Sequence, residues 1–199
     1  MKEILVILGH PSGNSFNHAI AETVINKLTC SGYKVLFHDL YKENFDSVLL
    51  ENEIPKNGVC SEKIIKHCNE LKECEGIIVI HPNWWGQPPA IVKGWIDKVF
   101  RPGIAYEFLD GDNGEGIPVG LLRAKFAIVF NTSNTSMERE DLIFNDPLET
   151  IWKNCIFGLC GVQNFYRKIF NIIITSTEEI RKDWLAEVEM IVEQFCPIK

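Results

Sequence analysis

Residues 3–17 read EILVILGHPSGNSFN and contain the pattern that decides the fold. The stretch opens with a short continuous apolar run, Glu3–Leu8, which is typical of a parallel strand buried on both faces. The next segment, Gly9–Ser15, is rich in Gly, Pro, Ser and Asn and is expected to form a loop. A helix is predicted over Phe16–Leu28, with Ser15 or the asparagine before it available as the N-cap.

Strand and helix signals continue to alternate to the end of the chain. Strands are predicted at residues 3–8, 34–40, 76–81 and 125–131 and within 162–174. Helices are predicted at residues 16–28, 61–74, 88–100 and 146–159 and from the capping box at 176–179 to about residue 195. This alternation predicts an α/β fold, a doubly wound five-stranded parallel sheet with helices on both faces, formed by residues 1–199 as a single domain.

The remaining segments, 41–59, 101–122 and 132–145, are predicted to be loops. In a doubly wound sheet the ligand binds beyond the carboxyl ends of the strands, near the point where the strand order reverses. We therefore expect the functional residues in the loops that follow the first, third and fourth strands.

Composition and charge exclude several classes of protein. Lys and Arg number 20 against 27 Asp and Glu, so the net charge of −7 argues against a nucleic-acid partner. We expect no membrane insertion, because no apolar run approaches the roughly 18 residues that a bilayer crossing requires. The seven cysteines form no CxxC pair and follow no secretion signal, which favours reduced thiols in a cytoplasmic protein.

The first loop has the composition of a phosphate-binding loop. Its sequence, GHPSGNSFN, lacks both GxGxxG and the GKS or GKT ending of nucleoside-triphosphate loops. It nevertheless combines hydroxyls, amides and a helix N-terminus, which together can hold a phosphate without a metal. The alternative is a capped strand-to-helix turn with no ligand.

The loop after the third strand, His81–Ala90, reads HPNWWGQPPA. Two adjacent tryptophans in a polar connector usually mark a site where a partner stacks. The prolines stiffen the segment and leave backbone N–H groups free for a ligand. An isoalloxazine ring, which is flat and has one polar edge, suits such a loop. The alternative is a tryptophan pair packed in the core or in a dimer interface.

The stretch from His81 to Tyr106, with PNWWGQPPAIVKGWIDKVFRPGIAY at its centre, resembles the NAD(P)H:quinone oxidoreductases of the flavodoxin-like fold. That family combines an aromatic turn with a PAxxKGWxDxVF helix and a G-x-A-Y end. The first loop is similar to the same family's phosphate loop, and the order of elements agrees over nearly the whole chain. The resemblance implies a flavin cofactor, FMN or FAD, with NADH or NADPH as electron donor, and a homodimer.

The resemblance also implies roles for individual residues. The phosphate end of the flavin would be held by His10, Ser15, Phe16 and Asn17. The isoalloxazine edge would be lined by Pro82, Asn83, Trp84 and Trp85. The catalytic residue would be Tyr106, at the mouth of an active site shared across the homodimer. Gly94 and Trp95 are expected to be structural, allowing close helix packing and filling the core.

The loop after the fourth strand departs from the family. Quinone reductases carry a Thr-Thr-Gly-Gly turn there, followed by a Tyr and a His. In this chain Glu138 stands at the Tyr position and Phe144 at the His position. The usual quinone mechanism is thereby in doubt, but flavin binding is not. Hydrogen bonds to the flavin's pyrimidine edge could still come from Thr132, Ser133 and Asn134.

Two further groups of polar residues carry little functional signal. The run from Glu138 to Asp141 is typical of a solvated loop, although it could touch the nicotinamide. The histidines His18, His38 and His67 form no HxxxH or HxH pair, so no metal site is expected.

The predicted function is transfer of hydride from NAD(P)H, through bound flavin, to a quinone-like or other small-molecule electron acceptor in a ping-pong cycle. The cofactor supplies the chemistry, and the protein supplies orientation and a dry aromatic slot. Two alternatives stay open. One is a non-catalytic electron carrier like the flavodoxins, and the other is an ancillary subunit of a potassium efflux system.

Overall fold

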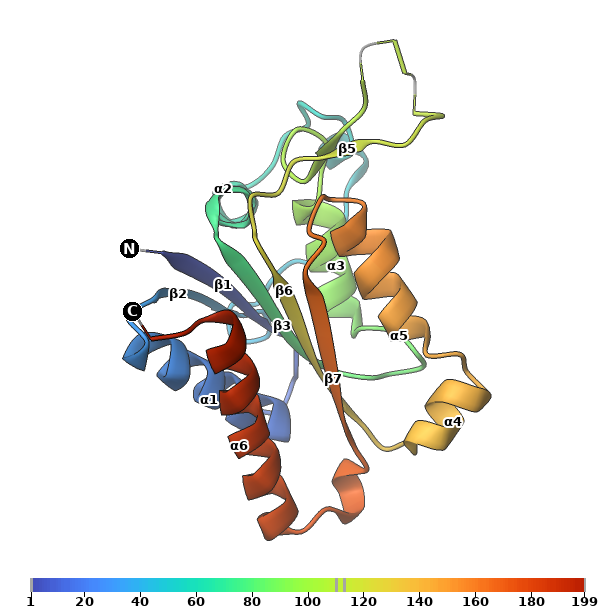
Figure 1. Ribbon diagram of the computed structural model, residues 1–199. Helices are drawn as coiled ribbons and strands as arrows, with labels where there is room; N and C mark the ends of the chain where they lie inside the picture. The colour runs from blue at the N-terminus through green and yellow to red at the C-terminus, as the bar shows by residue number, and fades with distance from the viewer. Residues whose placement is uncertain (1, 110, 113, 199) are drawn as a thin grey trace.

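A five-stranded parallel sheet runs through the centre of the computed structural model, which describes residues 2–109, 111–112 and 114–198 (Figure 1). Its strands are β1 (Glu3–Leu8), β2 (Lys34–Asp39), β3 (Gly76–Pro82), β6 (Ala127–Ser133) and β7 (Phe165–Asn171). They lie in the order β2-β1-β3-β6-β7, and every neighbouring pair is parallel. This is the flavodoxin-like strand order, so the predicted fold class is confirmed.

The central strand β1 explains why its sequence is apolar throughout. Side chains alternate between the two faces of a strand, and both faces of β1 are covered. Leu5 and Ile7 belong to the core on one face, whereas Ile4, Val6 and Leu8 belong to the core on the other. All five are fully buried.

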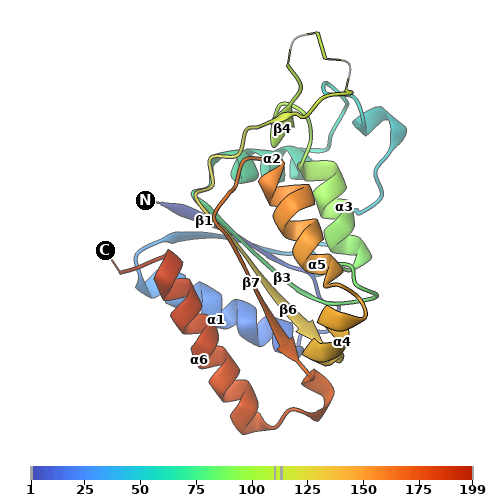
Figure 2. The same cartoon turned by 45° about the vertical axis from the view of Figure 1, so that its right-hand side comes forward.

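Helices cover both faces of the sheet (Figures 1 and 2). One face carries α1 (Phe16–Cys30) and α6 (Glu178–Phe195), which lie side by side. The other carries α2 (Glu62–Glu73), α3 (Ala90–Val99) and α5 (Pro147–Thr150), the last continuing into the π-helical stretch η2 (Ile151–Gly158). Shorter elements are the 3₁₀ turns η1 (Glu51–Glu53) and η3 (Ile173–Thr175), the helix α4 (Met137–Leu142), and the strands β4 (Tyr106–Glu107) and β5 (Val119–Gly120).

Helix α3 confirms the structural roles predicted for its central Gly and Trp. Trp95 is fully buried in the core. A Cβ atom added at Gly94 would lie 2.2 Å from the carbonyl oxygen of Ser47, so only glycine allows this loop to cross the helix so closely.

The predicted loops contain more structure than the sequence indicated. Segment 132–145 holds the last residues of β6 and the helix α4, which begins where the Ser136 side chain accepts a hydrogen bond from the backbone N–H of Arg139. Segment 101–122 contains the antiparallel pair β4–β5, and its residues Asp110 and Asn113 lie outside the described residues. The prediction that these segments lack regular structure was therefore wrong.

Candidate functional site

The loop after β1 ends by capping a helix. Ser15 is the N-cap of α1, and its side chain accepts a hydrogen bond from the backbone N–H of His18. The backbone N–H groups that open α1 have no partner within the helix itself. Because α1 follows the carboxyl end of β1, these groups and the positive end of the helix dipole lie at the carboxyl edge of the sheet. This geometry suits an anion.

A cavity of about 320 Å³ lies where β1, β3 and β6 end. Ten of the eleven residues that the sequence predicts to bind the cofactor line it: His10, Ser15, Phe16, Asn17, Pro82, Asn83, Trp84, Thr132, Ser133 and Asn134. The remaining walls come from Thr135 and Ile173. Residues from the first, third and fourth strands of the parallel sheet thus meet at the edge where a doubly wound sheet binds its ligand.

Asn17 joins the two ends of this cavity. Its side-chain Nδ2 donates a hydrogen bond to Thr132 Oγ1 at 2.9 Å, across 115 residues of sequence. The other amide atom, Oδ1, is buried and has no hydrogen-bond partner in the part of the chain that the structure describes. An unpaired buried acceptor is costly, and a hydroxyl-rich ligand such as the ribityl chain of a flavin could satisfy it. The residues present therefore fit the predicted cofactor.

The tryptophan pair occupies a tight reversal of the chain. Trp84 and Gln87 exchange both of their backbone hydrogen bonds, while Trp85 and Gly86 take positive φ angles of 58° and 70°. Two positive φ values between such a pair define a type I′ turn. The Asn83 side chain stabilises the turn, since its Oδ1 accepts a hydrogen bond from the backbone N–H of Gly86.

The turn directs the two indoles into different surroundings. Trp84 lines the smaller cavity, with its ring centroid 6.2 Å from that of His10. Trp85 is 99% exposed and lines a neighbouring cavity of about 680 Å³ instead. The walls of this larger cavity are Asn83, Trp85, Gly86, Thr135, Arg139, Glu140, Phe144 and Pro147. Asn83 and Thr135 line both cavities, so the two spaces adjoin.

Glu140 is a site residue that the sequence did not reveal. It belongs to the charge run predicted to be solvated, yet it is only 2% exposed. Its Oε1 accepts hydrogen bonds from Asn83 Nδ2 at 2.9 Å and from Ser133 Oγ at 3.3 Å. The carboxylate therefore ties the β3 loop to the end of β6. No spacing in the sequence marked it, because its partners lie on other elements.

His81, near the end of β3, supports the wall of the smaller cavity through its hydrogen bonds. Its Nε2 accepts a hydrogen bond from the indole N–H of Trp152 at 3.0 Å, so Nδ1 carries the hydrogen and donates to the Pro82 carbonyl at 2.9 Å. Burial lowers the pKa of His81 to about 4. A neutral, fully hydrogen-bonded imidazole thus positions Pro82 at the cavity wall.

Three residues that the family resemblance singled out in the sequence lie apart from the smaller cavity. Tyr106 is on β4, beyond the ends of the sheet strands opposite to α4 (Figures 1 and 2), and lines neither cavity. Burial raises the pKa of its hydroxyl. Glu138 is exposed on α4. Phe144 lines the larger cavity, where the Arg139 guanidinium lies 5.3 Å from the centre of its ring.

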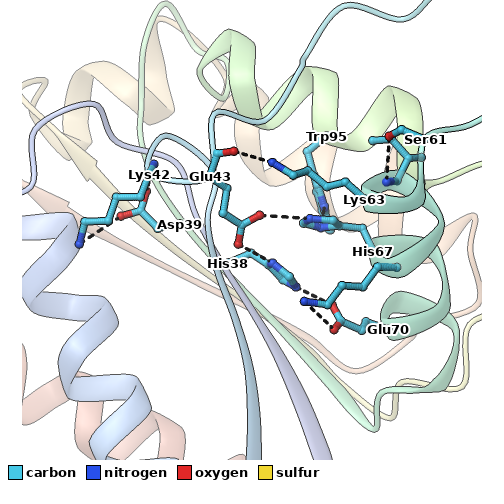
Figure 3. A network of polar contacts seen from close by, with 11 residues as sticks. His38, Asp39, Lys42, Glu43, Ser61, Lys63, His67, Glu70 and Trp95 are labelled. Atoms are coloured by element: carbon cyan, nitrogen blue, oxygen red, sulfur yellow. Dashed lines mark hydrogen bonds and ion pairs between the residues drawn. The ribbon is translucent and has the colours of Figure 1, made fainter.

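A second polar cluster lies between β2 and α2 (Figure 3). Its members His38, Glu43 and His67 place nitrogen and oxygen atoms within 4.8 Å of one another, as metal ligands would. However, the indole N–H of Trp95 donates to His67 Nδ1 at 3.1 Å. Neutral His67 therefore carries its hydrogen on Nε2, the atom that faces Glu43.

A nitrogen that carries a hydrogen has no lone pair for a metal. Burial lowers the pKa of His67 to about 3, in keeping with a neutral ring. Both nitrogens of His38 face carboxylates, Glu43 at 2.7 Å and Glu70 at 2.5 Å. We interpret the cluster as a structural one, in which the hydrogen bonds of His38 to Glu43 and Glu70 fasten α2 to the edge of the sheet.

Comparison with known proteins agrees with the fold. The family model described as "Flavodoxin-like fold" matches residues 2–189. The chain belongs to this family.

Two relatives extend the comparison to activity. An uncharacterized NAD(P)H oxidoreductase of Haemophilus influenzae is 31% identical over 89% of this chain and 88% of its own length. A ribosyldihydronicotinamide dehydrogenase [quinone] of Mus musculus is 25% identical over 93% of this chain and 88% of its own. These relatives confirm the predicted resemblance and place this flavodoxin-like chain among the NAD(P)H oxidoreductases.

A solved structure from Streptococcus mutans superimposes on the flavodoxin-like chain with a TM-score of 0.82 and 26% identity. It covers 96% of this chain and 99% of its own.

Among the helices of residues 2–109, 111–112 and 114–198, none combines the length and apolarity that crossing a bilayer would need.

Proposed function

We propose that this protein is a flavin-dependent oxidoreductase that transfers hydride from NAD(P)H to a quinone-like or other small acceptor in a ping-pong cycle. The observation that carries the proposal is the convergence of ten predicted cofactor residues on one cavity at the carboxyl ends of β1, β3 and β6. These residues come from three loops that are far apart in the sequence, so chance does not explain why so many of them line one cavity.

The two ends of the smaller cavity suit the two ends of a flavin mononucleotide moiety. The N-terminus of α1, with Ser15 and His10, would hold the phosphate. Asn17 Oδ1 would accept a hydrogen bond from a ribityl hydroxyl. Trp84 and the backbone around it would line the isoalloxazine, with Thr132, Ser133 and Asn134 at its polar edge. When bound, the flavin would supply reversible hydride acceptance and donation.

The larger cavity would receive the nicotinamide and then the acceptor in turn. It adjoins the flavin cavity through Asn83 and Thr135, and its walls are partly apolar through Trp85, Phe144 and Pro147. A ligand packed against these walls would itself shield the reacting atoms from water. Tyr106 lies on β4, at the opposite end of the sheet from α4, and does not line this cavity in the same chain. We therefore propose that it acts only within a homodimer, at the cavity of the second copy.

The proposal is tested by the absorbance spectrum of the purified protein with FMN or FAD, before and after anaerobic NADH or NADPH. A bound flavin band that bleaches rapidly would support the reductase and identify both cofactors. A bound flavin that stays oxidised with both nicotinamides would exclude the reductase and favour the electron carrier or the ancillary subunit. Failure to bind either flavin would overturn the site assignment.

A further inference from the structure

Three polar side chains form a hydrogen-bonded series behind the phosphate loop. Ser15 Oγ lies 2.9 Å from His18 Nδ1, and His18 Nε2 lies 3.1 Å from Asp39 Oδ2. Ser15 caps α1, His18 lies in its first turn, and Asp39 is the last residue of β2. The His18 and Asp39 side chains are buried, whereas Ser15 lines the smaller cavity.

The hydrogen bond between His18 and Asp39 runs in one direction, whereas the direction of the bond between His18 and Ser15 depends on the protonation of His18. An ionised Asp39 can only accept, so His18 Nε2 must carry a hydrogen. In neutral His18 the other nitrogen, Nδ1, then has a lone pair and accepts the hydroxyl hydrogen of Ser15. Ser15 is left with no hydrogen to offer a ligand in the cavity. In protonated His18, Nδ1 donates to Ser15 Oγ, and the Ser15 hydroxyl is free to donate toward the cavity.

Resting on the proposed function, we propose that His18 takes up a proton when the flavin phosphate binds, and that Asp39 and Ser15 couple this proton to the phosphate. The phosphate needs donors and is repelled by lone pairs, so it favours the protonated form of the series. By thermodynamic reciprocity, a proton on His18 favours the phosphate by the same factor. His18 and Asp39 are thus positioning residues that act on the ligand through Ser15.

The charged and titratable groups that surround His18 are Asp39, Lys42 and His10. Asp39 also accepts a hydrogen bond from the backbone N–H of Lys42 at Oδ1, and the Lys42 ammonium lies 3.6 Å from Oδ2. Both contacts bring a hydrogen-bond donor or a positive charge to the Asp39 carboxylate. On the loop after β1, the His10 ring lies 6.4 Å from the His18 ring. Burial, with a smaller contribution from His18, lowers the pKa of His10, so the His10 ring is less ready than a free imidazole to take the proton.

The test is calorimetric titration of the flavin-free full-length protein with FMN and with riboflavin, which lacks the phosphate. Titrations at pH 7.5 in buffers of different ionisation enthalpy count the protons taken up. At this pH the phosphate, with a second pKa of about 6, is already a dianion and contributes few protons itself. We expect uptake approaching about one proton with FMN and none with riboflavin. The FMN affinity should fall by up to about tenfold per unit as pH rises above 7.5.

Three variants show which residue takes up the proton. His18→Gln can still hydrogen-bond but cannot titrate, so it should bind FMN without proton uptake, and its riboflavin binding shows that it has folded. Asp39→Asn should take up fewer protons, because the imidazolium loses its carboxylate. Uptake that persists in His18→Gln, or that is lost only in His10→Gln, would overturn the inference. FMN binding by the unaltered protein without proton uptake would also overturn it, leaving the proposed function intact. Binding of neither flavin would overturn both.

Discussion

Among single residues, buried side chains support the site through hydrogen bonds that hold them in place. His81 is the clearest case. It is fully buried, its Nε2 accepts from Trp152 and Asn131, and its Nδ1 donates to the Pro82 carbonyl, so its partners determine its tautomer. The lowered pKa of this histidine has a direct consequence for stability.

The folded protein should lose stability in mild acid because of His81. Its folded-state pKa of about 4 lies below the ordinary value of 6.5, so the unfolded chain binds this proton first. The contribution is fully present above pH 6.5 and is lost as pH falls toward 4. Urea unfolding at pH 7.5 and pH 5 should show a loss that is smaller in His81→Gln by about 2 kcal/mol.

Glutamine is the informative replacement because it can accept from Trp152 and donate to the Pro82 carbonyl without titrating. The difference between the two proteins cancels the other groups that titrate in this range, such as His67. An equal loss in both proteins would show that His81 does not carry the effect.

At the scale of elements, the strands and long helices were predictable, and the short connecting elements were not. The strand β1 was predicted with its observed bounds, because a run buried on both faces is apolar at every position. The predicted loop 132–145 was wrong, since the charges of α4 look solvated in sequence and only the fold brings Glu140 against Asn83 and Ser133. The series from Ser15 through His18 to Asp39 was missed for the same reason.

Removing the Glu140 carboxylate should weaken flavin binding. In Glu140→Ala the Asn83 amide and the Ser133 hydroxyl lose their shared acceptor, and both lie on the cavity wall. Two lost hydrogen bonds of this kind correspond to about a tenfold rise in the Kd for FMN, measurable by quenching of flavin fluorescence. Glu140→Gln should bind nearly normally because its carbonyl oxygen still accepts from both groups. Glu138→Ala, an exposed position on the same helix, serves as the matched control.

The packing of α3 against residue 47 leads to a second prediction at this scale. Gly94→Ala should destabilise the protein by about 2 kcal/mol, because its new methyl group would meet a backbone oxygen. Gly13→Ala should change the free energy of unfolding by less than about 0.5 kcal/mol, since a Cβ there has nothing within 4 Å. Comparable unfolding curves for the two variants would contradict the packing argument.

At the scale of the whole molecule, the ligand cavity and the folded sheet depend on each other. Any flavin that binds only the folded chain stabilises it by mass action, by about 2.7 kcal/mol at a hundredfold excess over the Kd. For a chain of 199 residues this corresponds to a rise in Tm of about 5–10 °C. Thermal unfolding with FMN, FAD and riboflavin should rank the three by affinity, and a Tm unmoved by all of them would contradict a flavin site.

The way the smaller cavity is assembled bears on how the protein matures during synthesis. Its walls come from segments as far apart as Asn17 and Thr132, which are separated by 115 residues. β1 takes its place between β2 and β3, and β6 adds beside β3, before those walls can meet. A growing chain that has emerged from the ribosome only as far as β3 therefore lacks part of the wall of the smaller cavity. Because Ile173, which follows β7, also lines the cavity, cofactor loading is expected to follow translation of β7, which makes the loaded cofactor a marker of a completed sheet.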